Sequence, residues 1–304
     1  MSGLRSCRPG QASLNSSMNE VLLVLITLVA AMVNSALGHG FSSITVPVAL
    51  LFYTNRLLNP ALVLVEVGIN SYVTFMNRLS LPRVGRRLVP IVLGLLPGVI
   101  TGAFLLSRVN AEWLKLFVYG VLLPLILLQA AGTRRPIKLT PTVGIPFGTG
   151  LGILYSLTTV SGPPLALLFN NQGLLKQEFR AALGIIRIAE SVATAAAYYH
   201  LGLYTVPSLR LLGWIAPGVI IGVPLGAVLV RRVDAEVFRR LCMSFDAWIV
   251  GFGLSKVLVA LGLAVNPGAY LVLLIAVILD TALLMTFFSG RRLLPSLMVV
   301  SHGD

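Results

Sequence analysis

Long apolar runs separated by short polar stretches dominate the chain. The uninterrupted runs extend over residues 57–77, 88–106, 113–131, 181–201, 211–230, 237–263 and 268–289. A helix needs about 20 apolar residues to cross the hydrocarbon core of a bilayer. The pattern therefore predicts an all-α polytopic membrane protein.

Two further apolar runs are interrupted. The run over 19–53 is too long for one span and contains Gly38-His39-Gly40, and the run over 142–169 contains Ser161-Gly162-Pro163-Pro164. Such breaks leave backbone groups without helical hydrogen bonds, which lipid cannot replace. Each break must therefore be buried in protein or line a wet cavity.

The chain also contains an internal repeat. Three segments recur in the same order at spacings of 117, 120 and 124 residues: PVALLF (47–52) as PLALLF (164–169), PGVITG (97–102) as PGVIIG (217–222), and VNAE (109–112) as VDAE (233–236). We infer two homologous membrane halves. The resulting segments are an N-terminal tail (1–18), repeat 1 (19–131), a basic cytoplasmic linker (132–141), repeat 2 (142–263), an extra transmembrane helix (268–289) and a C-terminal tail (290–304).

The distribution of Lys and Arg favours opposite orientations for the two halves. If each interrupted run folds back as a re-entrant hairpin, one side of the membrane carries 15 Lys and Arg and the other carries 6; single crossings give 10 and 11. Positive residues gather on the cytoplasmic side, so the hairpins are favoured. Each half then crosses three times more, which inverts the second half and places the N-terminus outside and the C-terminus in the cytoplasm. Arg5 and Arg8 fall on the less basic side and argue against this topology.

Composition excludes several classes of protein. Apolar residues make up 57% of the chain and charged residues 11%, against roughly 25% charged in soluble domains. The net charge of +13 lies mostly in loops that fix topology, so we expect a lipid bilayer and no nucleic acid as partner. Cys7 and Cys242 form neither a disulfide framework nor a metal cluster, and we expect no cofactor.

The breaks suggest an anion site. Inverted repeats with interrupted helices are typical of secondary transporters that bind substrate near the midplane. A helix that begins inside the membrane presents unpaired N–H groups and about half a positive charge. We expect Ser161 to cap a helix starting at Gly162, and Ser42 or Ser43 to cap a short helix ending near Tyr53. The alternative is two kinks relieved by local packing.

Ionisable residues within the apolar runs narrow the choice. Arg187 lies mid-run with Glu190 at i+3, and an arginine there costs at least about 2.5–3.5 kcal/mol, so it should face a partner or a ligand. It either binds an anion, with Glu190 as its resting partner, or forms a structural pair. Glu66 can carry a proton, pair with Arg187 or be structural, and His39 can bind an anion, carry a proton or be structural. Asn70 is a weaker polar candidate. Other ionisable residues within apolar runs lie away from the breaks, where we expect interface or cavity-lining roles: Asp246, Lys256 and Asp280.

These features resemble a known family. Over about residues 35–263 the chain resembles the TauE/SafE family of sulfite and organosulfonate exporters. The shared features are an interrupted helix followed by Pro-Leu, a Pro-Gly-x-x-x-Gly span and a short basic-acidic loop. The Ser161-Gly162-Pro163-Pro164 break and the two PGVI runs carry most of the resemblance, whereas the first break is less glycine-rich than in most members. The resemblance implies a multi-pass carrier in the bacterial inner membrane for sulfite, sulfoacetate or another organosulfonate. It also implies coupling to a proton or anion gradient.

Our hypothesis is a secondary transporter, not an enzyme, that works by alternating access around a midplane site for a small anion. The expected substrate-binding residues are His39, Gly40, Ser42, Ser43, Asn70, Ser161, Gly162 and Arg187, and the expected proton-coupling residues are Glu66, Glu190 and His39. An anion channel is the alternative. An intramembrane enzyme is disfavoured because the chain has no HExxH or GxSxG motif. The sequence leaves open the anion, the direction of transport and whether the protein is a homo-oligomer.

Overall fold

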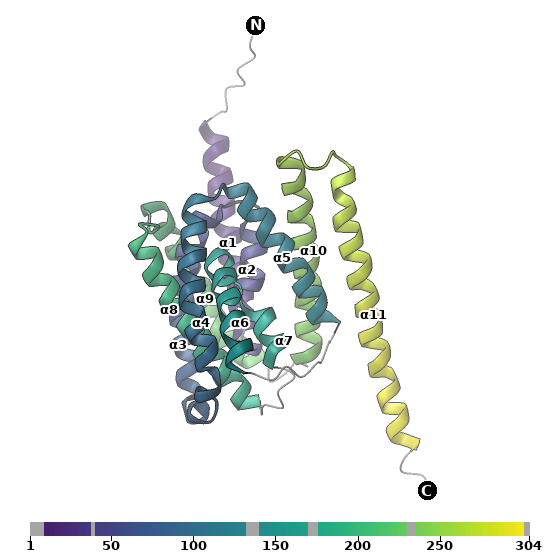
Figure 1. The fold of residues 1–304 in the computed structure, drawn as a ribbon. Helices are drawn as coiled ribbons and strands as arrows, with labels where there is room; N and C mark the ends of the chain where they lie inside the picture. Colours follow the sequence, from purple (N-terminus) through teal and green to yellow (C-terminus); the bar gives the residue numbers. More distant parts are fainter. Residues whose placement is uncertain (1–8, 38–39, 132–139, 170–175, 230–234, 301–304) are drawn as a thin grey trace.

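The chain folds into a bundle of helices in the computed structural model, which describes residues 9–37, 40–131, 140–169, 176–229 and 235–300 (Figure 1). The α-helices are α1 (Pro9–Leu37), α2 (Phe41–Ala49), α3 (Asn55–Met76), α4 (Leu81–Arg108), α5 (Ala111–Ala130), α6 (Pro141–Thr158), α7 (Gly162–Phe169), α8 (Lys176–His200), α9 (Val206–Leu229), α10 (Ala235–Ala260) and α11 (Leu271–Val300). Within the described residues, eight helices are long and apolar enough to cross a membrane: α1, α3, α4, α5, α8, α9, α10 and α11. The predicted all-α polytopic membrane protein is confirmed.

Both predicted interruptions are present as breaks between helices. Gly40 precedes α2 with a φ of 117°, a left-handed conformation that glycine adopts at low cost. In the second half, Thr159 follows α6 with a φ of 57°, and α7 begins at Gly162. The lengths of α2 and α7, nine and eight residues, are too short to cross a bilayer.

The start of α2 differs from the sequence prediction. We expected Ser42 or Ser43 to cap a helix that ends near Tyr53, but α2 already begins at Phe41 and ends at Ala49. Gly40 occupies the position before the helix and makes no side-chain capping bond. The backbone conformation of Gly40 sets the start of the helix, which frees the Ser42 hydroxyl for another partner.

Closely packed glycines explain the repeated PGVI motifs. A Cβ added to Gly98 of α4 would lie 2.2 Å from the carbonyl oxygen of Thr149 in α6. In the second half, a Cβ on Gly222 of α9 would lie 2.5 Å from the carbonyl oxygen of Leu28 in α1. Small residues four apart let two membrane helices approach until their backbones touch. The two motifs therefore join α4 to α6 and α9 to α1.

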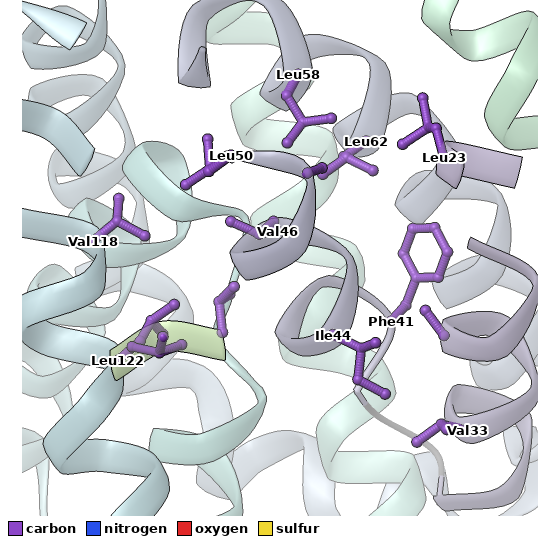
Figure 2. Close-up of a cluster of buried hydrophobic side chains, with 14 of the residues drawn as sticks. Leu23, Val33, Phe41, Ile44, Val46, Leu50, Leu58, Leu62, Val118 and Leu122 are labelled. Carbon is purple, nitrogen blue, oxygen red and sulfur yellow. The ribbon is translucent and has the colours of Figure 1, made fainter. Parts of the chain in front are cut away.

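The short helix α2 is buried inside the protein, and Figure 2 shows its apolar side chains within a cluster from several helices. Phe41, Ile44 and Val46 of α2 are buried, and they belong to one apolar cluster with Leu62 of α3 and Val118 of α5. This packing meets the requirement that irregular backbone at membrane depth be covered by protein.

The last helix is peripheral. α11 lies beside α10 at the edge of the bundle (Figure 1), and many of its described apolar side chains, among them Leu274, Ile278 and Met285, are exposed. A buried ion pair joins the two helices, with 3.0 Å between an Arg240 Nη1 and an Asp280 Oδ1.

Candidate functional site

The carboxylate of Glu66 is the centre of a buried polar cluster. Glu66 lies in the middle of α3 and is fully buried. Its Oε1 accepts a hydrogen bond from the Ser42 hydroxyl at 2.5 Å and lies 2.9 Å from Arg187 Nη2, which also donates to it. Its Oε2 accepts a hydrogen bond from the Tyr155 hydroxyl at 2.5 Å. Side chains from α2, α6 and α8 thus converge on one carboxylate from α3.

The guanidinium of Arg187 connects this cluster to the first break. Its Nη1 donates to Asn34 Oδ1 at 3.2 Å, and the backbone N–H of Phe41 donates to the same oxygen at 3.4 Å. Arg187 is only 3% exposed, and among the described residues its Nε has no hydrogen-bond partner. Arg187 therefore holds together the end region of α1, the start of α2 and the middle of α3.

Glu190 gives the second break a comparable arrangement. The Ser161 hydroxyl, immediately before α7, donates to Glu190 Oε2 at 2.6 Å. Glu190 is fully buried, and its Oε1 has no hydrogen-bond partner within the described part of the chain. At the start of each short helix, a serine therefore donates to a carboxylate. A carboxylate is favourable there because the N-terminal end of a helix is electropositive.

The other predicted residues lie around this cluster. Asn70 donates through Nδ2 to the backbone carbonyl of Arg187 at 3.3 Å, so it contacts the backbone of α8 and not the guanidinium. Gly162 is buried at the first position of α7, whereas Ser43 is only partly buried. The predicted residue His39 lies outside the described residues.

Two residues of the cluster escaped the sequence reasoning. Asn34 and Tyr155 bond Arg187 and Glu66 respectively, and each lies in the last turns before a break. A polar side chain at that position in an otherwise apolar run was the signal that could have identified them.

The carbonyl groups exposed by the second break also have side-chain partners. The Nδ2 groups of Asn55 and Asn59 donate to the carbonyl oxygen of Leu157 at 3.3 and 2.7 Å, and the Tyr198 hydroxyl donates to that of Ser156. The end of α6 lacks the next helical turn that would satisfy these acceptors. Side chains of α3 and α8 therefore stabilise the interrupted conformation of α6.

The cluster combines one cationic group with two carboxylates. Arg187, Ser42, Ser161 and Tyr155 supply N–H and O–H donors of the kind that bind oxyanions, and charge-assisted bonds to a guanidinium are the strongest of these. The cluster therefore places hydrogen-bond donors and two carboxylates in one buried region.

Comparison with known proteins gives one match. Residues 23–252 match the family model described as sulfite exporter TauE/SafE. No curated protein and no solved structure matches the chain. The matched residues extend from α1 into α10 and leave α11 outside.

Proposed function

The chain belongs to the TauE/SafE sulfite exporter family and is a membrane transporter, not an enzyme, and from this premise we propose that it carries a small sulfur-containing oxyanion. Sulfite, sulfoacetate and other organosulfonates are the candidate substrates. The membrane crossed is the inner membrane of a bacterium.

One observation carries the proposed site. The start of α2 and the α8 guanidinium meet at Glu66 through Ser42 and Arg187, and Ser161, before α7, bonds Glu190 one turn beyond Arg187. Two electropositive helix ends and a guanidinium thus lie around a single buried region. Pyramidal or tetrahedral sulfur oxyanions present several acceptor oxygens and match such a set of donors.

Contacts between helices support an inverted repeat. Glu66 lies beside Arg187 and Thr74 beside Gly184, so α3 and α8, which correspond in the two halves, are antiparallel. Antiparallel packing of corresponding helices is what opposite orientation of the halves requires.

Helix directions likewise support re-entrant hairpins. Gly94 approaches Ile145 and Gly98 approaches Thr149, so α4 and α6 are parallel. Because α3 and α4 are joined by a short turn and α8 opposes α3, α6 and α8 also point the same way. A chain that leaves α6 and enters α8 in the same direction must turn back between them, and α7 is the segment that does so. The same reasoning applies to α2. α9 packs parallel to α1 and runs opposite to α8, so α1 and α3 point the same way and the chain must turn back between them, at α2.

Transport then follows by alternating access, with one half rocking against the other around the fixed site. The more basic loops face the cytoplasm, which places the N-terminus in the periplasm. Proton coupling is assigned to Glu66, Glu190 and His39, because a buried carboxylate or imidazole can gain or lose a proton as the site opens to either side.

The test is flux of sulfite and of a panel of sulfonates in proteoliposomes. Replacing Arg187 with Ala is expected to lower saturable uptake at least about tenfold, since one charge-assisted bond contributes about 1.5–3 kcal/mol. Arg210→Ala in α9 is the matched control, because this arginine is exposed and should be dispensable. Unchanged flux in Arg187→Ala contradicts the proposed site, and flux that does not saturate favours a channel.

A further inference from the structure

The donors around Glu66 are those that a bound oxyanion needs. Its two carboxylate oxygens receive the Ser42 hydroxyl, the Tyr155 hydroxyl and one arm of the Arg187 guanidinium. These donors are buried side chains on three different helices. A sulfonate or sulfite group would make the same contacts through its own oxygens.

We propose that Glu66 is an internal substitute for the transported anion, and that the anion takes its place at Arg187 only when Glu66 binds a proton. This inference rests on the proposed transport function and adds to it a mechanism of coupling. One proton enters the site with each anion and leaves with it, so the two move in the same direction.

The first argument is that Glu66 already occupies the guanidinium of Arg187. Arg187 Nη2 is 2.9 Å from Glu66, and Nη1 is held by Asn34. An incoming anion therefore competes with Glu66 for the Nη2 hydrogen that Glu66 accepts, and it can take over this bond only when Glu66 releases it. Protonation of Glu66 removes the charge that holds it to Arg187, so the carboxyl group can turn away.

Charge is the second argument. The groups that face Glu66 are Ser42 from α2, Tyr155 from α6 and Arg187 from α8, while Glu190, also on α8, is a second carboxylate in the same buried region. With both carboxylates ionised the region already holds more negative than positive charge. Adding an unaccompanied anion would deepen that imbalance where water is excluded, which is costly. A proton that binds one Glu66 oxygen from the open side cancels the charge of a monovalent anion.

The sign of the pH dependence follows. Ionised Glu66 competes with the anion, so raising the pH weakens anion binding. Uptake of one proton per anion makes the apparent Kd about tenfold higher for each pH unit over the range in which the empty site is ionised. An alkanesulfonate is the appropriate probe because its own charge does not change in this range.

The experiment measures binding of isethionate, a monovalent sulfonate, to the purified full-length chain between about pH 6 and 8. The wild type should show the tenfold dependence, and Glu66→Gln should bind with a Kd that does not change with pH. Glu66→Asp should keep the dependence, because it restores the charge. Asp246→Asn in α10 is the matched control: it is a buried carboxyl outside the contacts described above, and its loss should leave the dependence intact.

Calorimetry of the wild type in two buffers with different ionisation enthalpies counts the protons directly. The expected value is one proton taken up per anion. Zero protons, or a Glu66→Gln protein that keeps the pH dependence, overturns the displacement mechanism but leaves anion transport standing. A wild type that binds no anion at any pH instead contradicts the proposed function itself.

Discussion

Two buried arginine–carboxylate pairs of similar length have different surroundings. Arg187 and Glu66 are 2.9 Å apart and share their region with hydroxyl, amide and carboxylate groups. Arg240 and Asp280 are 3.0 Å apart, and Arg240 Nη2 also donates to the backbone carbonyl of Asp280. The second pair joins α10 to α11, which lies outside the matched family residues, so we assign it the role of holding the peripheral helix.

At this scale the sequence predicts which ionisable residues lie buried within the helices better than it predicts which of them pair. The cost of placing Arg187, Glu66 and Glu190 in apolar runs was enough to single them out. The spacing of Arg187 and Glu190 on one helix suggests Glu190 as the resting partner and leaves Glu66 as a second possible partner. The ion pair in the structure is with Glu66 on the antiparallel α3. The choice of partner depends on how two distant helices pack. The spacing of residues along one helix holds no information about that packing.

At the scale of elements, close contact between backbones fixes the position of the interrupted helix α6. Glycines on both helices of the α4–α6 pair face the partner backbone, and Gly148 of α6 lies against Ile91 of α4. This contact places Tyr155, on the same helix, beside Glu66. Packing of α6 is thus a condition for the geometry of the site.

Two glycines of α6 provide a direct comparison. A Cβ on Gly148 would lie 2.2 Å from the carbonyl oxygen of Ile91, whereas a Cβ on Gly150 would have no atom within 4 Å. Gly148→Ala should therefore lower the free energy of unfolding by about 1–3 kcal/mol, as overpacking does. Gly150→Ala should leave it unchanged or raise it by up to about 1 kcal/mol through better helix propensity.

Reversible unfolding in detergent measures the free energy of unfolding of both variants. Equal stability of the two alanine variants would contradict the close α4–α6 packing.

The positions of both breaks could be predicted from glycine, serine and proline in apolar runs, but the start of α2 could not. Serine is a common N-cap, so Ser42 and Ser43 were the reasonable choices. The left-handed conformation of Gly40 lets the helix begin earlier, and Ser42 then contacts Glu66. A local capping preference was outweighed by a tertiary hydrogen bond.

At the scale of the whole molecule, several of the major contacts between helices form matched pairs. α4 packs on α6 as α9 packs on α1, and α3 with α8 and α5 with α10 pair across the halves. Such matched contacts are what the proposed two-fold relation between the halves predicts. The recurring segments predict a repeat, whereas the packing of α4 on α6 and of α9 on α1 depends on contacts that no single segment encodes.

Cysteine labelling tests the inverted topology. Leu79, between α3 and α4, is 88% exposed, and Val206, the first residue of α9 after the corresponding connection, is 66% exposed. In a background without Cys7 and Cys242, Leu79→Cys should react with a membrane-impermeant maleimide only from the cytoplasmic side, and Val206→Cys only from the periplasmic side. Labelling of both from the same side would contradict opposite orientation of the halves.

The most direct test of the anion site is a structure of the protein with 2-bromoethanesulfonate, whose bromine marks the ligand. We predict that the sulfonate lies between the starts of α2 and α7, with an oxygen about 2.7–3.2 Å from the Arg187 guanidinium and with Glu66 displaced from it. A sulfonate bound elsewhere, with the Arg187–Glu66 ion pair intact, would contradict the account.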